Sequence, residues 1–124
     1  MKTSNTYYEK YAKTIVMDID DTISFANTYN DVGAYSEAIP NTELISVMQK
    51  LASQGYKFIL HTARGWISCK EDVRAAETKY RKQIEAWLQK YHVPYDKLLF
   101  GKPYGIWYVD DKSLRPEEFI KKFR

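Results

Sequence analysis

The segment TIVMDIDDT, residues 14–22, places a short apolar run rich in β-branched side chains directly before three aspartates. Such a run is typical of a buried parallel strand. We therefore predict a strand that begins with the apolar run Thr14–Met17 and ends at Asp18. Alternate residues of an extended chain share a face, so Asp18 and Asp20 point the same way. Two carboxylates ~4 Å apart repel by about 4 kcal/mol at an effective dielectric constant of about 20. The pair therefore needs a counter-ion.

Strand and helix patterns alternate along the rest of the chain. Residues 22–38 are polar and are predicted as a loop with a small hairpin. Periodicity, capping signals and prolines then predict a helix from Pro40 to Gly55, a strand over 56–61, a helix over 69–91, strands over 98–100 and 106–109, and a helix from Pro116. This alternation predicts an α/β fold around a mostly parallel sheet, and 124 residues suffice for one domain, 1–124.

Composition narrows the classes of partner and location. The formal net charge is +3 and the basic residues are spread along the chain, which argues against a nucleic-acid-binding surface. Cys69 is the only cysteine, so no intrachain disulfide forms and we expect a cytoplasmic protein. No apolar run reaches the length of a membrane span, so we expect no membrane partner.

Polar residues follow each predicted strand, where parallel sheets bind their ligands. Asp18 and Asp20 follow the first, Thr62 and Arg64 the second, Lys102 the third, and Asp110-Asp111 the fourth. Carboxylate oxygens without a His or Cys cluster favour Mg²⁺. Two carboxyl groups, a hydroxyl, a lysine and a metal together suit phosphoryl transfer. Arg64 has two open interpretations: it binds phosphate, or it pairs with a carboxylate.

These residues match four motifs of a known family in their order. Residues 18–22 match Asp-x-Asp-x-Thr after an apolar strand, Thr62 matches the second motif, Lys102 the third, and Asp110-Asp111 the acidic fourth. The chain therefore resembles a phosphatase of the haloacid dehalogenase (HAD) superfamily. The resemblance implies a Rossmann-like, three-layer sandwich.

The same resemblance implies roles for the individual residues. Asp18 is the expected nucleophile and Asp20 the expected general acid and base, with Thr62 and Lys102 holding the phosphoryl group. The expected Mg²⁺ ligands are Asp18, the Asp20 backbone carbonyl and Asp111, with Asp110 in support; the order of the last two is open. The expected substrate-binding residues are Ile19, Thr62, Ala63, Arg64 and Lys102. Asp21 is expected to tolerate substitution.

The chain leaves no room for a cap domain of the kind that such phosphatases often insert. Residues 22–40 are too few for more than a flap, and seven residues separate Lys102 from Asp110. The resemblance then implies a capless enzyme, which takes large substrates or uses a second subunit to complete its active site. Helix 69–91, Trp66 and the N-terminal tyrosines are candidate contact surfaces. The expected substrate is a small phosphorylated molecule, with sugar phosphates first by family analogy.

Two other functions fit part of the pattern. A receiver-like signalling module also combines an acidic pair, a phosphorylated aspartate, a threonine and a lysine. Its acidic pair lies near the N-terminus, whereas here a second acidic pair follows Lys102, and this order argues against it. A catalytically idle phosphate-binding protein is the other alternative, although every chemical position is filled.

Overall fold

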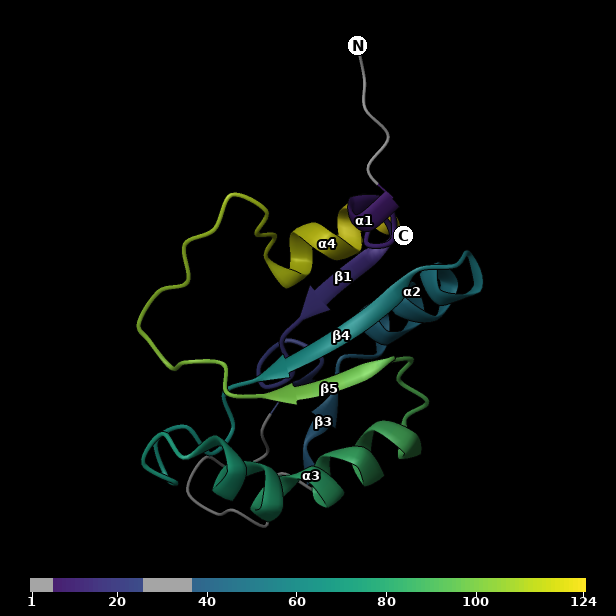
Figure 1. Cartoon of the computed structure of the whole chain (residues 1–124). Helices are drawn as coiled ribbons and strands as arrows, with labels where there is room; N and C mark the ends of the chain where they lie inside the picture. Colours follow the sequence, from purple (N-terminus) through teal and green to yellow (C-terminus); the bar gives the residue numbers. More distant parts are fainter. Residues whose placement is uncertain (1–5, 26–36) are drawn as a thin grey trace.

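A parallel sheet of three strands organises the computed structural model, which describes residues 6–25 and 37–124. The strands are β1 (Thr14–Met17), β4 (Lys57–Thr62) and β5 (Lys97–Phe100), in the order β1-β4-β5 (Figure 1). Met17 lies opposite Leu60, and Thr62 opposite Phe100. The carboxyl ends of the three strands therefore meet at one edge, as the sequence predicts.

Helices follow the strands in the predicted alternation. The structure has α1 (Thr6–Glu9), α2 (Thr42–Ser53), α3 (Val73–Lys90) and α4 (Pro116–Phe123), and α2 and α4 pack against each other (Figure 1). Short strands β2 (Ser24–Phe25) and β3 (Ile39–Pro40) pair antiparallel, which confirms the predicted small hairpin at its described ends. Residues 26–36 of that segment lie outside the described residues. No helix of the described chain is long and apolar enough to cross a membrane.

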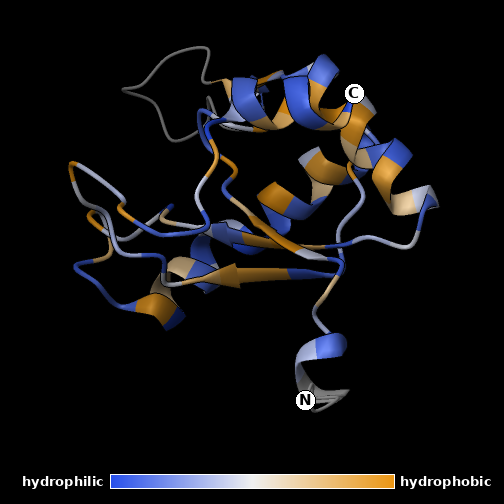
Figure 2. Ribbon diagram, turned by 90° about the horizontal axis from the view of Figure 1, so that it is seen from above, coloured by the Kyte–Doolittle hydropathy of each residue, from blue (hydrophilic) through white to orange (hydrophobic). Residues whose placement is uncertain are grey.

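The two faces of the sheet are covered unequally. Phe58, Leu60 and Leu98 are buried on one face, in the same core cluster as the buried apolar side chains of α2 and α3. Hydrophobic and hydrophilic residues alternate along the helices (Figure 2). On the other face, Val16 of β1 is 64% exposed and Leu99 of β5 is also exposed. The predicted α/β fold with a mostly parallel sheet is confirmed, and β1 is an edge strand of the described sheet.

The predicted fourth strand, residues 106–109, is wrong. Ile106 and Val109 are 87% and 95% exposed, and the segment pairs with no strand of the described sheet. The Tyr108 hydroxyl instead donates to the Pro103 carbonyl at 2.6 Å, and the Lys102 Nζ lies 4.2 Å from the centre of the Tyr108 ring. Of the residues that suggested a strand, Tyr108 makes local contacts, whereas Ile106 and Val109 are left exposed without a neighbouring strand in the described sheet.

The predicted start of the long helix at Cys69 is also wrong, since α3 begins four residues later at Val73. Lys70 and Glu71 have φ angles of 53° and 66°, a left-handed conformation that a right-handed helix cannot contain. The Asp72 side chain then caps the helix by accepting the backbone N–H of its third residue at 3.0 Å. The apolar spacing fits the helix body, but the preceding turn decides its start.

Helix α2 begins at Thr42 rather than at the predicted Pro40 because Asn41 is its N-cap. The Asn41 Oδ1 accepts the Leu44 N–H at 3.2 Å, and its Nδ2 donates to the Thr22 carbonyl at 3.0 Å. One side chain thus caps the helix and ties it to the aspartate-rich loop after β1.

Candidate active site

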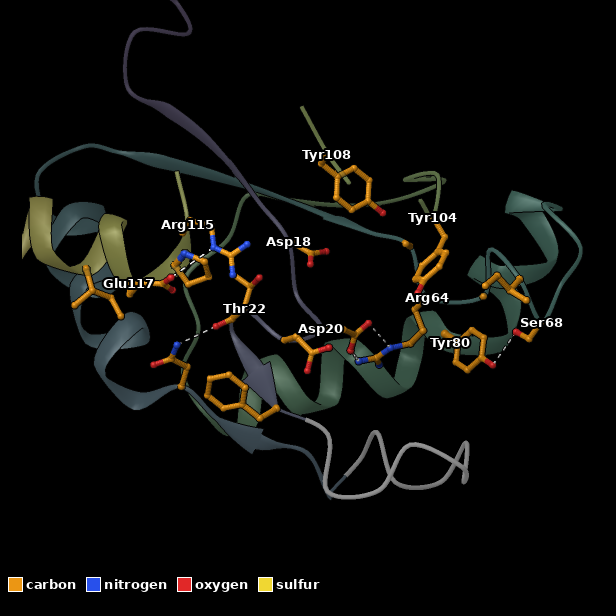
Figure 3. A pocket seen from close by; sticks show the side chains of 18 of the residues that line it. Asp18, Asp20, Thr22, Arg64, Ser68, Tyr80, Tyr104, Tyr108, Arg115 and Glu117 are labelled. Atoms are coloured by element: carbon orange, nitrogen blue, oxygen red, sulfur yellow. Dashed lines mark hydrogen bonds and ion pairs between the residues drawn. The ribbon is translucent and has the colours of Figure 1, made fainter. Parts of the chain in front are cut away.

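An open pocket of about 900 Å³ lies beyond the carboxyl ends of the strands (Figure 3). The aspartates after β1 and the residues after β4 share its wall, including Asp18, Asp20, Ala63 and Arg64. Lys102, which follows β5, reaches the same place, since its Nζ lies 3.4 Å from the Asp18 carboxylate. The structure therefore brings together the polar groups after three of the four predicted strands.

The loop after β1 winds around one carbonyl group. The Ile19 carbonyl accepts the backbone N–H groups of Thr22, Ile23 and Ser24 at 3.1, 2.9 and 3.1 Å. The Ser24 hydroxyl adds a fourth hydrogen bond at 3.3 Å. The Ile19 side chain is buried in the core, so only its backbone is available for the predicted substrate contact. This turn holds the aspartates on either side of Ile19 at the pocket.

Asp21 is more constrained than the sequence suggests. Its φ angle is 61°, in the left-handed region that Gly, Asn and Asp adopt most readily and β-branched residues avoid. It is exposed and also lines the pocket. We therefore expect position 21 to tolerate only residues that accept a left-handed backbone conformation, such as Asn and Gly.

Asp18 is a partly buried carboxylate held between two donors. Burial raises the pKa of its carboxyl group, while the Lys102 ammonium and the Ile19 backbone N–H partly oppose that rise by stabilising the charged form. Asp20 adds to the rise through like-charge repulsion. The structure therefore holds the Asp18 negative charge at a cost to the free energy of folding.

We predict that Asp18→Asn stabilises the metal-free protein at neutral pH. A carboxyl group with a raised pKa in the folded state contributes stability below its unfolded pKa, near 3.8, and that contribution is lost as the pH rises through the folded pKa. The amide carries no such dependence. Urea unfolding in EDTA should show the variant above the wild type at neutral pH, with the difference shrinking as the pH falls.

Asp21→Asn is the matched control, since it removes the same charge from an exposed position and Asn accepts its backbone conformation. We expect this control to follow the pH dependence of the wild-type protein. A wild-type protein that is more stable than Asp18→Asn at neutral pH would contradict the assigned cost of the Asp18 charge.

Arg64 pairs with Asp20, which favours one of its two interpretations. Its Nη2 lies 2.5 Å from Asp20 Oδ1 and its Nε donates to Oδ2 at 3.3 Å, so the contact is bidentate (Figure 3). The Arg64 side chain is only 4% exposed, whereas that of Asp20 is 35% exposed. A buried guanidinium that grips both carboxylate oxygens fixes the orientation of Asp20 in the pocket.

Thr62 is buried beneath the pocket wall and bonds to the backbone of the residues around it. It is fully buried, its Oγ1 accepts the Arg64 backbone N–H at 3.0 Å, and its carbonyl accepts the Lys102 N–H at 3.2 Å. Thr62 is not among the residues that line the pocket, whereas Ala63 is. The contact of Thr62 with a phosphoryl group stays a prediction. In the structure, Thr62 holds the backbone at Arg64 and at Lys102 in place.

Asp110 and Asp111 are not among the residues that line the pocket with Asp18. Both lie in the exposed loop that replaces the predicted fourth strand, where Asp110 accepts the Lys112 N–H at 2.9 Å and Asp111 lies 3.3 Å from the Lys112 Nζ. Within residues 6–25 and 37–124, no group of three or more His, Cys, Asp or Glu side chains is placed to hold a metal ion. The strand that was predicted to precede this pair is absent from the described sheets, and the role of the pair as a metal ligand stays a prediction.

Sequence reasoning missed several residues that shape the pocket, among them Gly65, Tyr104 and Tyr108. Gly65 has a φ angle of 86°, and a Cβ atom there would lie 2.6 Å from the Ala76 Cβ, so only glycine lets the chain after Arg64 approach α3 so closely. Tyr104 and Tyr108 line the pocket from the loop after β5. A glycine just after a strand end could have indicated a close approach of the backbone at Gly65. The two tyrosines gave no such signal, because Tyr108 lay within a predicted strand and Tyr104 beside it.

The chain is similar to a solved structure of matching length. A protein from Vibrio cholerae, known from its crystal structure, is 32% identical, with 87% of each chain covered and a TM-score of 0.80. A chain of the Pnkp1/Rnl/Hen1 RNA repair complex is 31% identical with a TM-score of 0.53. The match covers 89% of the present chain but only 30% of that larger one.

The fold is shared with a further enzyme. The D,D-heptose 1,7-bisphosphate phosphatase of B. bronchiseptica, in complex with magnesium and phosphate, is 17% identical with a TM-score of 0.50. The match covers 82% of the present chain and 54% of that enzyme, and at this identity it shows the fold alone. No family model and no curated protein matches the sequence.

Proposed function

We propose that the chain, whose four motifs resemble those of the haloacid dehalogenase superfamily and whose fold is shared with a phosphatase, is a Mg²⁺-dependent phosphatase of that superfamily that hydrolyses a phosphomonoester through an aspartyl phosphate on Asp18. The described residues contain no cap domain. The observation that carries the proposal is the placement of two carboxylates in one pocket. Asp18 lies 3.4 Å from the Lys102 Nζ, and Asp20 is held by Arg64.

In the first step, an Asp18 carboxylate oxygen attacks phosphorus and the bond from phosphorus to the ester oxygen breaks. Asp20, protonated at this stage, gives its proton to the leaving oxygen, so the alcohol departs neutral. The Lys102 ammonium is a fixed positive charge beside Asp18 and offsets charge on the phosphoryl oxygens. The products of this step are the alcohol and an aspartyl phosphate.

In the second step, water attacks the phosphorus of the aspartyl phosphate and Asp20, now ionised, takes a proton from it. The bond from phosphorus to the Asp18 oxygen breaks, which releases inorganic phosphate and restores the Asp18 carboxylate. Arg64 keeps the Asp20 carboxyl group oriented through both proton transfers, because it grips both oxygens from a buried position.

The donor set at the pocket fits Mg²⁺ in its chemistry. Every candidate ligand is an oxygen, and Mg²⁺ prefers carboxylate and carbonyl oxygens. Because Arg64 occupies the Asp20 side chain, the Asp18 carboxylate and the Asp20 backbone carbonyl are the proposed ligands from the first loop. Asp111, with Asp110 in support, is the proposed further ligand. When bound, the ion would neutralise charge on the phosphoryl oxygens.

We propose a small phosphomonoester as the substrate. Sugar phosphates and related metabolites are the first candidates by family analogy. The likeness in fold to a heptose bisphosphate phosphatase supports a phosphate ester. We retain the proposals that Ile19, Thr62, Ala63, Arg64 and Lys102 contact the substrate and that a second subunit completes the open pocket. A cytoplasmic location stays a prediction from the single cysteine.

Metal removal tests the proposed function. We expect the purified chain to release phosphate from p-nitrophenyl phosphate, to lose nearly all of this activity in EDTA, and to regain it when Mg²⁺ is added back. Release of p-nitrophenol in a colorimetric assay measures each state. Unchanged activity in EDTA would contradict the metal requirement. A chain that is stably phosphorylated on Asp18 without turnover would support the receiver-like alternative instead.

A further inference from the structure

Three exposed aromatic side chains line the same pocket as Asp18 and Asp20. Phe25 comes from β2, and Tyr104 and Tyr108 from the loop after β5. Figure 3 shows the two tyrosine rings at the pocket. Each of the three side chains is between 42% and 64% exposed. Large aromatic rings that are exposed at the wall of a pocket are available to a ligand that covers them.

The cationic side chains at the pocket each lie beside a carboxylate. Two cationic side chains line the pocket within the described residues, and both are already paired with carboxylates: Arg64 with Asp20, and Arg115 with Glu117 at 3.5 Å. Lys102 is paired with Asp18. Arg64 is buried and held through both Asp20 oxygens, whereas the Arg115–Glu117 pair is 73% exposed on both sides and weak, so the charges of the pocket do not select the group that covers the rings.

We propose that the phosphate ester hydrolysed at this site carries a nucleobase, which stacks on the rim formed by Phe25, Tyr104 and Tyr108. A base offers a flat π face to an aromatic ring, and such stacking needs no charge. The inference rests on the proposed phosphatase function and names its substrate class. Two sources share this chemistry: a free nucleoside monophosphate, and the terminal phosphate of a single strand of nucleic acid.

A matched pair of substrates tests the inference. Adenosine 5′-monophosphate and ribose 5-phosphate present the same phosphate on the same sugar carbon and differ in the base. We expect kcat/KM for the nucleotide to exceed that for the sugar phosphate by about tenfold or more, the size of one base–aromatic stack. Equal values for both substrates would overturn the inference while leaving the phosphatase function in place, since the sugar phosphate is still hydrolysed.

Substitutions of the rim residues test whether the base stacks on these rings. We expect Tyr104→Ala and Phe25→Ala to move the ratio of the two kcat/KM values toward one, and Tyr104→Phe to keep it, because the ring remains. Tyr108 is avoided, since its ring packs on Lys102. Ile106→Ala is the control, because Ile106 is exposed in the same loop and does not line the pocket. A ratio unchanged in both alanine variants would overturn the rim assignment.

A short oligonucleotide with a 5′-phosphate separates the two sources. A higher kcat/KM than that of the mononucleotide supports a nucleic-acid end, and a lower value supports a free nucleotide. If the wild-type chain hydrolyses none of these esters and also fails on p-nitrophenyl phosphate with Mg²⁺, the proposed function is wrong and this inference falls with it. Hydrolysis of p-nitrophenyl phosphate and ribose 5-phosphate but of neither nucleotide substrate overturns the inference alone.

Discussion

Replacing Asp18 by Asn should lower the kcat for p-nitrophenyl phosphate by about four orders of magnitude or more, because a neutral amide is a poor nucleophile for phosphorus. The variant keeps the shape of the side chain and removes its charge. Phosphate release at saturating Mg²⁺ measures the loss. Since the Asp18 charge is held at a cost in the metal-free protein, the metal-free variant should be at least as stable as the metal-free wild type, so that its inactivity cannot be assigned to a fold weakened by the substitution.

Asp21→Asn is again the matched control, since it makes the same chemical change three residues further along the loop. It should keep activity within a few-fold of the wild type. Turnover by Asp18→Asn at a comparable rate would exclude Asp18 as the nucleophile and would leave the Asp20 carboxylate as the next candidate in the pocket.

The second large effect is expected for Asp20→Asn, whose loss of rate should depend on the leaving group of the substrate. Asp20→Asn should lower the rate on an alkyl phosphate by about 10² to 10⁴-fold, because an alkoxide needs the proton that Asp20 supplies. The rate on p-nitrophenyl phosphate should fall much less in its first step, since p-nitrophenolate leaves without protonation. Single-turnover measurements on both substrates separate this step from the hydrolysis of the intermediate. A full rate on the alkyl phosphate would exclude the acid role.

Arg64→Met should show the same dependence on the leaving group with a smaller loss, because Arg64 acts by orienting Asp20. Lys57→Met is the control, since it removes a positive charge from an exposed ion pair with Asp96, at 3.7 Å, at the opposite end of β4 from the pocket. An equal loss on both substrates in Arg64→Met would show that Arg64 acts on the phosphoryl group instead, which is the interpretation that the structure disfavours.

Local patterns predicted most of the fold. The apolar run before Asp18 predicted β1 at its observed bounds, and Pro116 predicted the first residue of α4, because Pro favours the first turn of a helix. The start of α3 could not be predicted in this way. Its turn contains two left-handed residues, Lys70 and Glu71, and neither is of a type that signals this conformation.

By itself, the sequence determined that Asp18 and Asp20 follow a strand on the same face, since that depends only on the period of an extended chain. The tertiary structure decided which partner each carboxylate has. Lys102 is 84 positions from Asp18 and Arg64 is 44 from Asp20, and these pairs meet only because β4 and β5 pair in parallel beside β1. It also decided that residues 106–109 form a loop, because a residue pattern favours a strand but pairing requires a neighbour in register.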